Sequence, residues 1–167
     1  ILIGQAPDPD LIHKLKDQIQ SCDIVLGVHD VILHDYGPGQ QFASAHVEVD
    51  AHRDILQTHD KIDNIEKEVQ KSMGIELVLH MDPVILHDPA TEFYRKKVET
   101  ALSIINKGWT FHDFRIVKGS THVNLVFDVV VPFEEKRSHK EIKELIQEHI
   151  DTNENICLVI TVDHPFS

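Results

Sequence analysis

The 167-residue sequence has only two cysteines, seven glycines and seven prolines, and aromatic residues make up 6% of it. Cys22 and Cys157 are too few and too far apart to indicate a disulfide framework. The low glycine and proline content excludes a largely disordered chain of low complexity. No apolar run approaches the roughly 18 residues that a membrane-spanning helix needs. We therefore expect folded globular structure without a membrane segment in these residues.

Positive charge is also scarce, since 16 lysines and arginines face 28 acidic residues and the net charge is -12. A phosphate backbone or an anionic membrane surface would be repelled, so we predict no nucleic-acid partner. The same charge favours cations. Thirteen histidines are dispersed along the chain, and neutral imidazole is the commonest metal ligand in proteins. The composition therefore favours a protein that binds divalent metal ions.

Hydrophobic periodicity and turn signals predict the same order of elements twice. In the first half we expect a helix opened by Asp8-Pro9-Asp10, strands over 28–34 and 42–50, a helix capped by Asp54 and ended by Gly74, and a strand over 75–82 closed by Pro83. In the second half we expect a helix from Thr91, strands over 111–117 and 123–131, a helix with a capping box at Ser138, and a strand over 156–163.

The two halves also share motifs at nearly constant offset. His29-Asp30 recurs as His112-Asp113, and Asp82 recurs as Asp163. Such self-similarity indicates a duplication. We predict an α+β fold of two tandem αββαβ modules, ferredoxin-like or metallochaperone-like, each with a three-stranded sheet and two helices on one face. The predicted domains are residues 1–88 and, as a degenerate copy, residues 89–167.

Alternation along the strands places several candidate ligands on one face of the first sheet. His46 lies opposite a core row in the second strand, and His80 and Asp82 share the outer face of the third. Two imidazoles and a carboxylate are donors typical of a zinc-like site. Spacing leaves His29 and His59 ambiguous, because each shares its row with apolar residues and could equally be a packing residue.

Five spaced motifs of the first half resemble the C-terminal domain of cation diffusion facilitators: Leu26-Gly27-Val28-His29-Asp30, Tyr36-Gly37-Pro38-Gly39, His46-Val47-Glu48-Val49, Thr58-His59-Asp60 and His80-Met81-Asp82-Pro83. The resemblance covers roughly residues 2 to 85. It implies metal ligands at His29, His46, His59, His80 and Asp82, with Asp82 able to bridge two ions.

The resemblance further implies a regulatory tail at the cytoplasmic face of the cell membrane. In that family a six-helix membrane domain exchanges protons for metal, and the tails form a homodimer whose interface binds metal and so favours transport. Because the chain begins with Ile1 rather than Met, we expect it to be part of a longer integral membrane protein that carries this transmembrane domain.

The second half has a poorer set of candidate ligands. His112, Asp128 and Asp163 occupy the places of His29, His46 and Asp82, respectively. Lys143 and Thr161 replace His59 and His80, and an ammonium group beside a site opposes cation binding. We expect a structural copy that has lost its site, with a weak, oxygen-rich site for a harder ion such as manganese as the alternative.

Three functions fit these patterns. The leading hypothesis is a regulatory domain without catalysis, in which metal occupancy is read out as dimer closure. The first alternative is a two-metal hydrolase bridged by Asp82, with Glu48 and Asp30 as candidate bases. The second is a free-standing metal buffer. Histidine-rich ligation favours zinc, although manganese, iron and cobalt accept the same donors.

Overall fold

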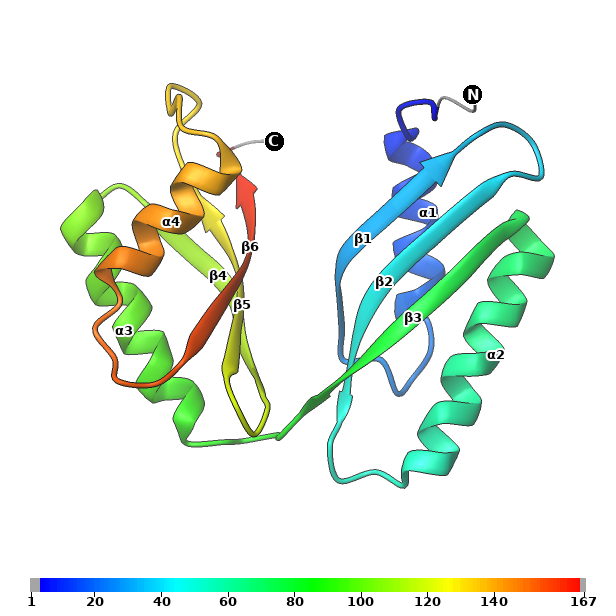
Figure 1. The fold of residues 1–167 in the computed structure, drawn as a ribbon, viewed down its shortest axis with the longest axis horizontal. Coiled ribbons are helices and arrows are strands. Elements are labelled where there is room, and N and C mark those ends of the chain that lie inside the picture. Colours follow the sequence, from blue (N-terminus) through cyan, green and yellow to red (C-terminus); the bar gives the residue numbers. More distant parts are fainter. Residues whose placement is uncertain (1–3, 166–167) are drawn as a thin grey trace. The chain divides into compact units, whose positions relative to one another are not determined.

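The computed structural model describes residues 4–165 and divides the chain into two compact units, Ile1–Leu86 and His87–Ser167. The first unit contains α1 (Pro9–Gln20), β1 (Gly27–Asp35), β2 (Gln41–Asp50), α2 (Ile55–Met73) and β3 (Ile75–Val84) (Figure 1). The second contains α3 (Ala90–Ile105), β4 (Thr110–Lys118), β5 (Val123–Val130), α4 (His139–His149) and β6 (Ile156–Asp163). The predicted α+β fold of two αββαβ modules is confirmed. The first three and last two residues of the predicted domains lie outside the described part.

Both units contain a three-stranded sheet of the same topology. In the first, β2 is central, antiparallel to β1 and parallel to β3; in the second, β5 has the same role between β4 and β6. A parallel pair needs a crossover connection, and α2 and α4 supply it in the two units. Within residues 4–165, no helix combines the length and apolarity needed to cross a membrane.

One face of the first sheet forms the core of its unit. Alternate residues of β2 are buried there with the apolar stripes of the two helices: Ala43, Ala45, Val47 and Val49 with Leu15, Ile19, Ile62, Ile65 and Val69. Because side chains alternate along a strand, the residues between those of the core row point to the other, helix-free face. The candidate ligands of β2 and β3 lie on that open face.

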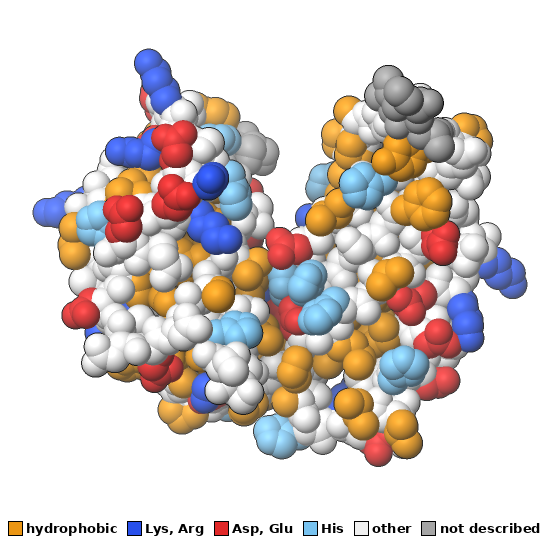
Figure 2. Space-filling view, viewed as in Figure 1, with side chains coloured by type: hydrophobic (Ala, Val, Ile, Leu, Met, Phe, Trp, Pro, Cys, Tyr) orange, Lys and Arg blue, Asp and Glu red, His pale blue; other side chains and the backbone are white. Residues whose placement is uncertain are grey.

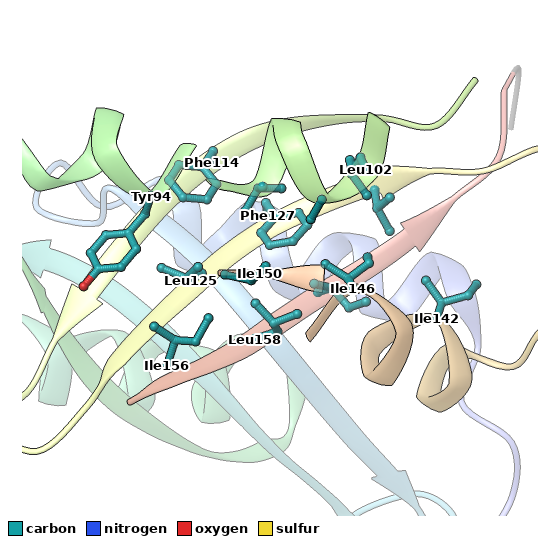
Figure 3. Packing of buried hydrophobic residues seen from close by; sticks show 14 of the residues in the cluster. Tyr94, Leu102, Phe114, Leu125, Phe127, Ile142, Ile146, Ile150, Ile156 and Leu158 are labelled. Atoms are coloured by element: carbon teal, nitrogen blue, oxygen red, sulfur yellow. The ribbon is translucent and has the colours of Figure 1, made fainter. Parts of the chain in front are cut away.

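The second unit has its own core, which is richer in aromatic side chains. Phe127 of β5 lies between Phe114 of β4 and the aliphatic residues of α4, as Figure 3 shows from close by. Tyr94 and Leu102 of α3 belong to the same cluster (Figure 3). Each unit therefore buries an apolar core between one sheet face and two helices.

The helix ends follow the predicted capping residues. Asp8 and Asp54 accept hydrogen bonds from backbone N–H groups in the first turns of α1 and α2. Gly74 ends α2 with a φ of 69°, a left-handed conformation that favours glycine. Ser138 and Glu141 form the reciprocal capping box of α4.

The third strand is longer than predicted. We expected Pro83 to close it after Asp82, but β3 continues to Val84, with Pro83 opposite Val49 and the N–H of Ala51 donating to the Val84 carbonyl. An edge strand tolerates proline because only one of its sides needs hydrogen-bond donors. The extension places Asp82 inside the strand, where its backbone is held in register.

Candidate metal centre

A β-bulge in β1 decides where His29 points. The register with β2 pairs His29 with His46 and Leu33 with Ala43, and it shifts between His29 and Ile32. Asp30 lies in this bulge with a φ of 51°, a conformation that aspartate tolerates better than most residues. The extra residue changes the alternation, so that His29 lies on the open face although Leu33 is in the core. Alternation along the sequence alone did not determine on which face of the sheet His29 lies.

The three histidines form a row across the open face of the first sheet. His46 is opposite His29 on one side and opposite His80 on the other. The centroids of the His29 and His46 rings are 4.9 Å apart, and those of His46 and His80 are 4.7 Å apart. Histidine and acidic side chains lie next to each other on the surface of this unit (Figure 2).

Asp82 joins all three imidazoles. Its Oδ2 atom is 3.1 Å from Nε2 of His29 and 3.0 Å from Nδ1 of His46, and its Oδ1 atom is 3.3 Å from Nε2 of His80. Asp82 is only 5% exposed, whereas the side chain of His80 is 68% exposed. The cluster thus extends from a buried carboxylate to the surface.

Glu48 also belongs to this cluster, although its sequence position did not predict a role as a ligand or as a partner of a ligand. It is 2% exposed, and Nδ1 of His29 is 2.9 Å from its Oε2 atom. Alternation puts Glu48 on the same face as His46, which was the available signal, but we considered it only as a base for the hydrolase alternative. The bulge at Asp30 brings His29 to Glu48, and a bulge is not visible in a strand pattern.

The electrostatics of the cluster are those of a cation held between two carboxylates. Burial lowers the pKa of the His29 imidazole, but hydrogen bonds to Asp82 and Glu48 outweigh it and raise that pKa to about 9. Burial raises the pKa of Asp82, but hydrogen bonds from His29 and His46 outweigh it and leave that pKa below its ordinary value. At neutral pH the metal-free cluster therefore contains a protonated His29.

His59 is not brought into this cluster. Among the described residues of the first unit, the three potential ligand atoms that all lie within 4.8 Å of one another belong to His29, His46 and Asp82. His59 lies exposed on α2, a helix whose buried stripe packs on the other face of the sheet. In its own chain His59 is thus separated from the open face.

The second unit gathers the three predicted counterparts more loosely. Ligand atoms of His112, Asp128 and Asp163 lie within 4.8 Å of one another. Nδ1 of His112 is 3.5 Å from Asp128 Oδ2, and its Nε2 is 3.7 Å from Asp163 Oδ2. Asp113 repeats the bulge of β1 with a φ of 55°. The backbone of the site is therefore retained while its donors are changed.

The charges around this second cluster differ from those expected. Lys143 is exposed on α4. Burial and the nearby Asp163 raise the pKa of Asp128, and they outweigh the charges of His112 and Arg115, which lower it. Thr161 holds the register position opposite Asp128 that His80 holds opposite His46. The second unit thus offers one imidazole where the first offers three.

A hollow of about 290 Å³ adjoins the histidine row of the first unit. Ile32, Ser44 and Val78, which follow one another across the three strands, line it together with His46 and His80. Val78 is 64% exposed and Ile32 is 51% exposed. The open face therefore combines candidate ligands with uncovered apolar side chains.

The raised pKa of His29 makes a prediction about stability in the absence of metal. A raised folded-state pKa contributes stability that is fully present below about pH 6.5 and is lost as pH rises through about 9. Between these limits we expect the free energy of unfolding of chelator-treated protein to fall by at most about 3 kcal/mol. Urea unfolding at several pH values measures this. His29→Gln should flatten the dependence and the exposed His13→Gln should not, and an equal fall in both variants would contradict the assignment.

Comparison with known proteins agrees with the geometry of the first unit. Residues 7–84 match the family model described as the cation efflux protein, cytoplasmic domain. No curated protein matches the chain. The match covers both helices and all three strands of the first unit, including the whole histidine cluster. The family consists of transporters and is not a known enzyme family. Residues 7–84 of this chain are therefore similar to the cytoplasmic domain of cation efflux, or cation diffusion facilitator, proteins.

Proposed function

We propose that the first unit is the metal-sensing, regulatory domain of a divalent cation efflux transporter that exchanges metal for protons. The observation that carries this proposal is the convergence of three imidazoles on the buried carboxylate of Asp82. The remainder of the transporter would be a transmembrane domain outside this chain, with the unit on the cytoplasmic side of the cell membrane. We assign no catalytic role to it.

The donor set suits a zinc-like ion. Nitrogen donors of His29 and His46 and the oxygen of Asp82 are the mixed ligands that Zn²⁺ accepts in tetrahedral sites, and iron, cobalt or manganese can use the same donors. Ligation through Nε2 of His29 requires that its proton leave, so binding at neutral pH should release protons. A divalent charge would then replace the imidazolium between the two carboxylates.

Asp82 is placed to bridge two ions. One oxygen faces His29 and His46, and the other faces His80. His80 is largely exposed, so an ion held by His80 and Asp82 would need further ligands beyond these two. A second copy of the chain could supply them.

We assign His59 to that role. It is exposed on α2 and cannot reach the cluster of its own chain, but in a homodimer it could approach the open face of a partner. The exposed Ile32 and Val78 beside the cluster give this face an apolar surface that a partner could cover. Two acidic domains repel each other, and divalent ions shared between them would offset this repulsion. Metal occupancy would then be read out as closure of the dimer.

The alternatives receive less support. A two-metal hydrolase needs a free general base beside the ions, but the carboxylate of Glu48 is already hydrogen-bonded to His29. A free-standing metal buffer would not explain why the first unit is similar to the cytoplasmic domain of cation efflux transporters. We further propose that the second unit, which has one imidazole at its cluster, is a degenerate copy with a structural role.

The site assignment predicts a loss of zinc binding in a double variant. His46→Ala with Asp82→Asn removes a nitrogen donor and the bridging charge while keeping the shape of the buried side chain, so zinc affinity should fall at least 100-fold. Competition titration with a chromophoric chelator measures it. His52→Ala with Asp50→Asn is the matched control, because it removes a surface histidine–aspartate pair. Unchanged affinity in the first variant would contradict the assignment.

The dimer proposal predicts that His59 acts across the interface. Zinc should reduce the radius of gyration of the wild-type dimer, and His59→Ala should remove most of this contraction while the site around Asp82 still binds zinc. Small-angle scattering and sedimentation, with and without zinc, measure shape and mass. The exposed His52→Ala serves as control. Full contraction in His59→Ala would show that His59 is not a ligand.

If the second unit is a degenerate copy, removing its candidate ligands should not change the number of zinc ions bound per chain. His112→Ala with Asp163→Ala should leave the number of bound zinc ions per chain as it is in the wild type, because one imidazole and two carboxylates bind zinc weakly. Elemental analysis after removal of free metal measures this number. Fewer ions in the variant would show that the second unit keeps a working site.

A further inference from the structure

Glu48 is an acidic residue on the open face of a sheet that is nevertheless almost fully buried. It is 2% exposed, and its Oε2 atom is 2.9 Å from Nδ1 of His29. A buried carboxylate is unfavourable unless hydrogen bonds and charge compensate for lost hydration. The contact with His29 compensates for part of the hydration that the Glu48 carboxylate loses on burial.

The space for this carboxylate depends on Gly27. The register of β1 and β2 places Gly27 directly opposite Glu48. A Cβ atom at position 27 would lie 2.7 Å from Oε2 and 3.0 Å from Oε1 of Glu48, which is closer than non-bonded atoms approach. The backbone at Gly27 is not left-handed, so glycine is needed here for the close approach and not for its φ. Any side chain at this position would push the carboxylate away from His29.

The second unit has lost both members of this pair. Thr110 and Val130 occupy the register positions of Gly27 and Glu48, and they face each other in the same way. The bulge and the histidine are retained there, but Nδ1 of His112 instead lies 3.1 Å from the exposed Asp113. The glycine and the glutamate are thus present together in one unit and absent together in the other, as expected if the glycine serves to accommodate the glutamate.

We propose that Glu48 is a positioning residue that fixes the ring of His29 for metal ligation through Nε2, and that Gly27 makes room for it. An ionised carboxylate only accepts hydrogen bonds, so the Nδ1 atom facing Glu48 carries the proton. In the metal-free protein the Nε2 atom also faces a carboxylate, that of Asp82, but Asp82 is itself a proposed ligand. A metal bound beside Asp82 would therefore take the place of the Nε2 proton and leave the proton on Nδ1. The inference rests on the proposed metal site and names how one of its ligands is oriented.

The alternative orientation would give a different site. If Nδ1 were the ligating atom, the ring would have to turn away from Glu48 and break the hydrogen bond between the His29 imidazole and this buried carboxylate, which is unfavourable. Partners that fix the tautomer of a ligating histidine typically contribute about 10–100-fold in metal affinity. Glu48 should therefore matter to binding although it touches no metal itself.

The test uses the full 167-residue chain and zinc alone. We expect Glu48→Val, which installs the residue of the second unit, to weaken zinc binding about 10–100-fold. Glu48→Gln should lose less, because its amide oxygen still accepts from Nδ1–H. The matched control is Glu76→Val, which removes an exposed glutamate of β3. Circular dichroism in the absence of zinc checks the fold of each variant.

A double-mutant cycle tests the role of Gly27. Gly27→Ala should weaken zinc binding in the wild type and have little further effect in Glu48→Val, because it acts by displacing the carboxylate. Nitrogen chemical shifts of His29 in zinc-loaded protein provide a readout besides affinity. We expect Nδ1–H with Nε2 bound to zinc in the wild type, and a mixture of the two nitrogens as ligands in Glu48→Val.

Two failures can be told apart. If His46→Ala with Asp82→Asn does not affect zinc affinity, the proposed metal site itself is wrong. If that variant loses zinc but both Glu48 variants bind as tightly as the wild type, with Nε2 of His29 still the ligand, the positioning role is overturned. Should Glu48→Val not fold, Glu48→Gln and Gly27→Ala decide by the same two measurements, and wild-type affinity in both would overturn the proposal.

Discussion

The arrangement of the histidines on the open face of the first unit depends on the carboxylate of Asp82. This carboxylate is buried near the end of β3, two residues before the strand ends at Val84, and is contacted by each histidine of the row across β1, β2 and β3. Without compensating charge such a group would be unfavourable inside a protein. The protonated His29, held between Asp82 and Glu48, supplies that charge. A divalent cation at the same place would supply more of it, and this would be the physical basis of the proposed metal-dependent state.

The geometry of the cluster follows from the sheet that carries it. Neighbouring strands hold His29, His46 and His80 in register, so the spacing of the rings is set by backbone hydrogen bonds and not by side-chain packing alone. The helices cover the other face and leave this one open. The site therefore stands on rigid elements while its outer side stays accessible to ions and to another protein surface.

The second unit keeps the backbone arrangement of the first and changes the side chains on its open face. It repeats the topology, the register and the left-handed aspartate of the bulge, but aspartate and threonine stand where the first unit has histidines, and Val130 stands in place of Glu48. An αββαβ scaffold with a bulge is thus compatible with very different donor sets. The core, which is continuous within each unit, explains why the fold tolerates such changes on its open face.

The sequence by itself determined the element order, its repetition in the second half and the helix ends, because periodicity, capping residues and glycine at a left-handed position act locally. It also determined that His46, His80 and Asp82 share a face, since alternation along a regular strand is local too. The tertiary structure alone decided the place of His29, because the bulge at Asp30 reverses the alternation. It likewise decided the pairing of His29 with Glu48, the burial of Glu48 against Gly27, and the separation of His59 from the cluster. These depend on which strand segments meet and on which side of the sheet the helices pack, and residues distant in the sequence settle both.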